Sequence, residues 1–130
     1  MANFREKQRR LMRAVSSIKI SDRRHTNCFK FFARDTQLKH ELAKLSLYIE
    51  LRLMGHTLYV EPTFYDLKGR PDILDITTHT IYEVLNTEKI SNVKLKEGYY
   101  PDIFNIVPVQ ATKLIEQLQG MLDKVKKTKP

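Results

Sequence analysis

Two carboxylates, Asp72 and Glu83, have the spacing in this chain that most directly indicates chemistry. The alternation of apolar and polar residues predicts strands over 73–77 and 80–85, and a tight connection at 78–79 predicts an antiparallel hairpin. In that hairpin the two carboxylates lie close to opposite each other. Such a pair is costly unless something neutralises it, and Mg²⁺ is a suitable neutraliser. A metal held there would polarise a phosphate and lower the pKa of an attacking water.

Each carboxylate also has a structural explanation. Asp72 follows a proline in a turn, where an aspartate can serve the turn alone. Glu83 lies in an otherwise apolar strand and needs a partner, which a salt bridge to Lys44 or Arg70 would also supply. The residues alone therefore leave a metal site and a structural ion pair open.

The elements that must position this pair follow from the periodicity of the rest of the chain. The predicted segments, in chain order, are a helix over 36–54, strands over 57–64, 73–77 and 80–85, a helix or turn over 89–98, a strand over 103–109 and a helix over 111–125. Gly55 ends the first of these helices. Neither a repeat nor a linker interrupts the order, which predicts one α/β domain over 36–130 after an extension over 1–35.

The extension carries the charge excess of the chain. Residues 1–39 hold 11 Lys and Arg against 3 Asp and Glu, whereas residues 40–130 hold 12 of each kind. Nucleic acid is the commonest partner of such a cluster. Residues 3–16 predict a basic helix on which Arg5, Arg9 and Arg13 share one face. That face suits a phosphate backbone, although pairing of these arginines with carboxylates elsewhere is an equally good explanation.

Three phenylalanines near the end of the extension, Phe29, Phe31 and Phe32, form an aromatic cluster among basic residues. Nucleic-acid bases stack on exposed aromatic rings. Phenylalanine prefers burial, however, so the cluster is better explained as an anchor of the extension on the core.

Length and composition exclude several classes of protein. The chain has 130 residues and one cysteine, Cys28, which rules out an intrachain disulfide and a zinc site with several cysteines. No apolar run approaches the ~20 residues that span a bilayer. An N-terminal signal sequence is not evident either. We expect no membrane partner and a location in the cytoplasm or another intracellular compartment that contains nucleic acid.

The pair Pro71-Asp72, ten intervening residues and Glu83-Val84-Leu85 form a motif that resembles the PD-(D/E)XK nuclease superfamily. The predicted order also resembles the αβββαβ core of that restriction-endonuclease-like fold, a mixed central sheet flanked by helices. The run His40-Glu41-Leu-Ala-Lys44, then Gly55 and Tyr59-Val-Glu61-Pro, is similar to the opening of small members such as Holliday-junction-resolvase-like endonucleases. Together these features cover about residues 36–109.

The resemblance implies a role for each matching residue. Asp72 and Glu83 would be metal ligands, the main-chain carbonyl of Val84 would complete the site, and Glu41 would be an accessory acid. The implied cofactor is Mg²⁺ or Mn²⁺.

One position departs from the family pattern. The usual lysine, which orients the attacking water and stabilises developing charge, is replaced by Leu85. Lys44 is the best substitute, because it lies one helical turn from Glu41 and shares its face. Lys89 and Lys94 are weaker candidates.

The sequence therefore predicts a metal-dependent DNA endonuclease that hydrolyses phosphodiester bonds, acting as a homodimer because duplex cleavage needs two sites. The alternative is a catalytically inactive nucleic-acid-binding protein of the same fold, for which Leu85 is the main argument. A third possibility is that the basic extension binds an acidic protein. The residues predicted to bind nucleic acid are Arg5, Arg9, Arg10, Arg13, Arg23, Arg24, Lys68 and Arg70.

Overall fold

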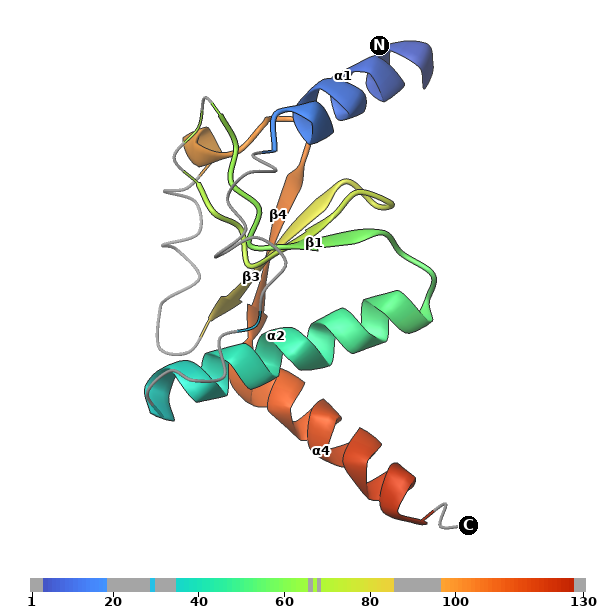
Figure 1. The fold of residues 1–130 in the computed structure, drawn as a ribbon, viewed down its shortest axis with the longest axis vertical. Helices are drawn as coiled ribbons and strands as arrows, with labels where there is room; N and C mark the ends of the chain where they lie inside the picture. Colours follow the sequence, from blue (N-terminus) through green and yellow to red (C-terminus); the bar gives the residue numbers. More distant parts are fainter. Residues whose placement is uncertain are drawn as a thin grey trace.

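A four-stranded mixed sheet lies between helices on both of its faces (Figure 1). A computed structural model describes residues 4–18, 29, 35–65, 67, 69–85 and 97–127. The elements in these ranges are α1 (Phe4–Ser16), α2 (Asp35–Leu53), β1 (Leu58–Val60), β2 (Ile73–Asp75), β3 (Thr80–Leu85), the 3₁₀ turn η1 (Glu97–Tyr99), β4 (Asn105–Gln110) and α4 (Ala111–Lys127). The prediction of an α/β domain with a mixed central sheet is confirmed.

The strands follow one another in the sheet in the order β1-β2-β3-β4. The first two pairings are antiparallel and the β3–β4 pairing is parallel. The predicted hairpin is confirmed, with Leu74 opposite Ile81 and Asp75 opposite Thr80. Its turn includes His79 at a φ of 55°.

Alternation along the strands directs apolar side chains into two cores. On one face, Ile73 and Val84 pack with Ala43 and Leu47 of α2 and with Leu114 of α4. On the other face, the neighbouring strand residues Leu74 and Ile81 pack with Phe64, Tyr100, Phe104 and Ala14 of α1. Figure 1 shows α1 on one side of the sheet and α2 with α4 on the other.

The first helix of the predicted extension is thus integrated into the core. Ala14 and Ile18 are buried, and Ile18 forms an isolated antiparallel bridge with Phe64. The boundary between extension and domain at residue 35 stays a prediction.

The first predicted strand is shorter than its apolar pattern indicated. The pattern covers 57–64, whereas β1 ends at Val60. Glu61 adopts a φ of 46°, which breaks the extended conformation, and Pro62 cannot donate a ladder hydrogen bond. Phe64 returns to the sheet through isolated bridges with Ile18 and Leu67.

Helix α2 ends at Gly55 as predicted. Gly55 has a φ of 85°, and its N–H donates to the Arg52 carbonyl at 3.0 Å, which completes the helix end. Leu47 and Leu51 of the helix are buried, whereas Leu53 near its end is 80% exposed. Lys44 and Ser46 are also fully buried.

The remaining expectations concern the middle and the ends of the chain. The helix or turn expected over 89–98 lies mainly outside the described residues. Its last two residues, 97 and 98, belong to the 3₁₀ turn η1. Of the helices in the described ranges, none combines the length and apolar composition that crossing a bilayer requires.

Candidate active site

Three carboxylates form a row across the open end of the β2–β3 hairpin. The Glu61 N–H donates to the Asp72 carbonyl at 3.1 Å, which continues the β1–β2 pairing by one residue. The β2–β3 register pairs Ile73 with Tyr82, so the next step places Asp72 level with Glu83. The predicted juxtaposition of Asp72 and Glu83 therefore occurs, with Glu61 as a third member of the row.

Asp72 is buried and partly surrounded by other negative groups. Its Oδ2 accepts a hydrogen bond of 2.7 Å from the Val84 N–H, and its Oδ1 lies 3.2 Å from His40 Nε2. Burial is the main reason that the pKa of Asp72 is well above its usual value, and the charge of Glu83 raises it further. The Val84 hydrogen bond and the charge of Lys44 act in the opposite direction.

Glu83 is buried on the same strand end and receives a hydrogen bond from Tyr100. The Tyr100 hydroxyl donates to Glu83 Oε1. Burial and this bond raise the pKa of Tyr100, so the phenol stays protonated and remains a donor. The hydrogen bond fixes the orientation of the Glu83 carboxylate.

Gly69 makes the position of Tyr100 possible. A Cβ at Gly69 would collide with the Tyr100 ring and would lie 2.6 Å from the Tyr99 carbonyl oxygen. The Gly69 N–H donates to that same carbonyl at 3.1 Å. The absence of a side chain at residue 69 thus lets the ring reach Glu83.

Lys44 extends from α2 into the same end of the hairpin and is fully buried. Its Nζ lies 2.9 Å from Glu41 Oε1 and 3.0 Å from Glu61 Oε2. It also lies 5.9 Å from the centre of the Phe29 ring, which itself packs edge-on against Tyr48. The prediction that Lys44 and Glu41 face the hairpin agrees with this arrangement, and Phe29 is packed against α2.

The described interactions pair Lys44 with Glu41 and Glu61, and the charge of Lys44 also acts on Asp72, which lies beside Glu83. An excess of negative charge away from water is costly. Protonation of Asp72 relieves its repulsion by Glu83 in one way. A divalent cation would relieve that repulsion in another way, because its positive charge offsets the negative charges.

The donor set fits a small, hard cation in its chemistry. The carboxylates of Asp72 and Glu83 offer oxygen ligands, and Mg²⁺ uses one or two carboxylates with waters. Because the N–H and C=O of a strand residue face the same edge, the Val84 carbonyl faces the side on which Asp72 binds its N–H. Within the described ranges, no group of three or more His, Cys, Asp or Glu side chains is arranged to hold a metal ion.

Leu85, at the position where the resemblance leads one to expect a lysine, is buried. An amine for this site must therefore come from another element, and Lys44 is placed to supply it. Lys89 and Lys94 lie outside the described residues.

The predicted nucleic-acid-binding residues have three different outcomes. Arg5, Arg9 and Arg13 are exposed on α1. Arg10 instead forms a salt bridge of 2.9 Å with Asp102. Arg70 is half-buried next to the site, whereas Arg23, Arg24 and Lys68 lie outside the described residues.

Sequence reasoning did not assign functional roles to Glu61 and Tyr100. Glu61 was noted only within the run that resembles small nucleases of one superfamily. An acidic residue just after the first strand was a usable signal, because an antiparallel neighbour places it beside Asp72. No local pattern connects Tyr100 with Glu83, since the two meet only through the tertiary fold.

The turn end of the same hairpin contains another buried carboxylate, Asp75. Its Oδ2 lies 2.6 Å from His56 Nδ1, and its Oδ1 accepts hydrogen bonds from the N–H groups of Thr77 and Thr78 at 3.0 and 3.3 Å. These partners are those of an aspartate that stabilises a turn.

Compared with models of protein families, with curated proteins and with solved structures, the chain has no match.

Proposed function

We propose that the protein is a metal-dependent DNA endonuclease of the PD-(D/E)XK type. The observation that carries this proposal is the meeting of the buried Asp72 and Glu83 at one end of the sheet, where the charge of the buried Lys44 also acts on Asp72. These residues come from β3, α2 and the segment just before β2. Asp72 and Glu83 are both buried and the charge of one acts on the other, and buried, interacting titratable groups are typical of functional sites.

The arrangement of elements supports the same proposal. A helix, three antiparallel strands and a fourth strand parallel to the third are compatible with the expected αβββαβ order, whose second helix would fall outside the described residues. Asp72 immediately precedes β2 and Glu83 lies within β3, so the motif occupies matching places in this order.

In the proposed site Asp72, Glu83 and the Val84 carbonyl would hold Mg²⁺ or Mn²⁺. When bound, the ion supplies Lewis-acid activation of the phosphate and a more acidic water. Tyr100 orients Glu83, and the Val84 N–H orients Asp72. Lys44 supplies a fixed positive charge near the scissile phosphate, the part that Leu85 cannot play. Glu41 holds Lys44 in place.

The test is cleavage of supercoiled plasmid and of a four-way DNA junction with Mg²⁺ or Mn²⁺. We expect Asp72→Asn and Glu83→Gln to reduce the rate on the order of 10³-fold or more, because several kcal/mol of metal-dependent stabilisation is lost. Glu116→Gln, on the exposed side of α4, is the matched control and keeps full activity.

A second readout separates metal binding from cleavage. Ligands that bind only the folded state raise its melting temperature. We expect Mg²⁺ to raise the melting temperature of the wild type and of Glu116→Gln, but not that of Asp72→Asn. Absence of cleavage and of any metal effect, with DNA binding unchanged in all variants, would contradict the nuclease proposal.

That outcome would favour the second candidate function, a catalytically inactive DNA-binding protein of this fold. Two observations support this candidate: Leu85 replaces the usual lysine, and Lys44 is held by two carboxylates. For the active enzyme we propose a homodimer, so that each strand of a duplex meets one site. An intracellular compartment that contains DNA is the proposed location.

A further inference from the structure

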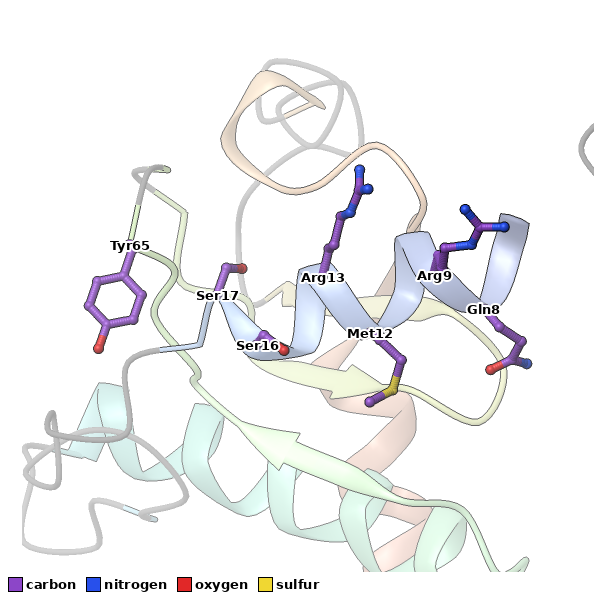
Figure 2. Close-up of a pocket in the computed structure, with 7 residues that line it drawn as sticks. All are labelled: Gln8, Arg9, Met12, Arg13, Ser16, Ser17 and Tyr65. Carbon is purple, nitrogen blue, oxygen red and sulfur yellow. The ribbon is translucent and has the colours of Figure 1, made fainter. Parts of the chain in front are cut away.

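A groove of about 610 Å³ runs between α1 and the segment that follows β1 (Figure 2). Its lining includes Arg9, Met12, Arg13 and Ser16 of α1, and Tyr65. Figure 2 shows the two arginines along one edge of the helix, Met12 along the other and Tyr65 beyond the C-terminal end of the helix. The groove therefore combines cationic, apolar and aromatic side chains.

The packing of α1 explains why these side chains face outward. Leu11, Ala14 and Val15 pack on the sheet, so the residues one position away around the helix are directed to solvent. The Tyr65 N–H donates to the Ser17 carbonyl at 2.9 Å, which ties its segment to the end of α1. The neighbouring Phe64 is buried, which anchors the backbone of Tyr65.

The arginines of the groove have no carboxylate partner within the described ranges, unlike Arg10, which pairs with Asp102. Arg9 and Arg13 are separated by one helical turn, about 6 Å along the axis. Two cations at this spacing suit successive phosphates of one strand. The groove also lies in the part of the chain that carries the positive charge excess.

The exposed ring of Tyr65 favours single-stranded over double-stranded nucleic acid. Tyr65 is 60% exposed, and Met12 of α1, which lines the same groove, has the same exposed fraction. A ring of this kind stacks with an unpaired base, because every base has an accessible face once it leaves the duplex. Bases inside a duplex already stack on each other and do not offer that face.

We propose that this groove binds a single-stranded segment of nucleic acid, with phosphates at Arg9 and Arg13 and a base stacked on Tyr65. The inference rests on the proposed function and specifies its substrate as DNA with an unpaired region. The groove and the carboxylate row are built from different residues, so the two proposals can fail separately.

The test measures binding of a fluorescent 12-nucleotide single strand and of a blunt duplex of equal length, by anisotropy in EDTA so that no cleavage occurs. We expect Tyr65→Ala to weaken single-strand binding about tenfold and to leave duplex binding unchanged, because only the unpaired base stacks. Tyr65→Phe keeps the ring and keeps the affinity. Tyr99→Ala, which removes another exposed tyrosine, is the control and has no effect.

A salt series tests the arginines. The double variant Arg9→Gln/Arg13→Gln should lower the slope of log affinity against log salt by about 1.4 for the single strand, since each phosphate contact contributes about 0.7. Lys124→Gln/Lys126→Gln, at the exposed end of α4, makes the same change in net charge and leaves the slope unchanged.

A 2-aminopurine in the strand reports stacking directly, because stacking quenches its fluorescence. Quenching by the wild type and by Tyr65→Phe, but not by Tyr65→Ala, supports the inference. Equal loss of affinity for both DNA forms in Tyr65→Ala, or equal effects of the two double variants, would overturn it. So would binding to neither DNA form, which would favour a protein partner. Loss of cleavage with this binding intact would contradict only the nuclease proposal.

Discussion

The two ends of the β2–β3 hairpin each bury an aspartate, and the surroundings of the two differ. At the turn end, Asp75 has an imidazole and two backbone N–H groups around its carboxylate. At the open end, Asp72 has one backbone N–H and a histidine, and it lies among the charges of Glu83, Glu61 and Lys44. Donors that match the acceptors complete a turn. The open end instead places like charges beside one another, and we propose that this arrangement suits a cation or a substrate.

Removal of Lys44 is expected to have the largest effect on stability, and it affects only the open end of the hairpin. Lys44→Met leaves the carboxylates of Glu41 and Glu61 buried without their cation, and we expect a loss of about 3–5 kcal/mol in the free energy of unfolding at neutral pH. Urea unfolding measures the loss, and Lys39→Met on the exposed side of α2 is the matched control. Equal stability of the two variants would show that Lys44 does not hold the open end together.

Neutralising Asp75 at the turn end of the hairpin is expected to lower the stability of the protein. Asp75→Asn replaces a charged acceptor of three partners, so we expect a loss of about 1.5–3 kcal/mol. Thermal and urea unfolding measure it. Cleavage and the effect of Mg²⁺ on the melting temperature should remain, because Asp75 does not belong to the proposed site. A selective loss of the metal effect in this variant would remove the distinction between the two ends.

The hydrogen bond from Tyr100 to Glu83 can be tested by a substitution at Gly69, which is not one of the carboxylates. Gly69→Ala introduces a Cβ that collides with the Tyr100 ring, and such overpacking costs about 1–3 kcal/mol. The displaced phenol no longer orients Glu83, so cleavage falls more than stability alone explains. Gly98→Ala is the control, because its added Cβ meets nothing within 4 Å. Identical behaviour of the two variants would contradict the role of Gly69.

The smallest expected effect is that of Asp72→Asn, which should raise stability, in contrast to the variants above, by an amount that depends on pH. Because the pKa of Asp72 is raised in the folded state, the stability it contributes is complete below its unfolded pKa and declines as pH rises through the folded pKa. Asparagine stays neutral throughout. Without metal, Asp72→Asn should therefore match the wild type in acid and exceed it at neutral pH by a few degrees in melting temperature, roughly 1 kcal/mol.

The measurement is a series of melting curves in EDTA from acid to neutral pH. A variant less stable than the wild type at neutral pH would show that Asp72 resembles Asp75 and that the two ends do not differ in kind.

Local patterns predicted the elements that depend on local periodicity. The hairpin, the end of α2 at Gly55 and the closing helix all occur where apolar spacing and turn residues indicated. The extent of β1 was overestimated because the pattern could not register the left-handed backbone at Glu61. The complete burial of Lys44 on α2 does not follow from apolar spacing, because it depends on Glu61, which lies after β1 and outside the helix.

The sequence by itself determined the sheet-forming segments, the opposition of Asp72 and Glu83 and the concentration of positive charge in the first 39 residues. These follow from alternation, hairpin register and composition, which are properties of neighbouring residues. Only the tertiary structure decided that Glu61 and Tyr100 join the pair, and that Tyr65 lines one groove with the arginines of α1. Such contacts depend on how distant elements pack, because charges, donors and rings far apart along the chain meet only when the two cores close on the sheet.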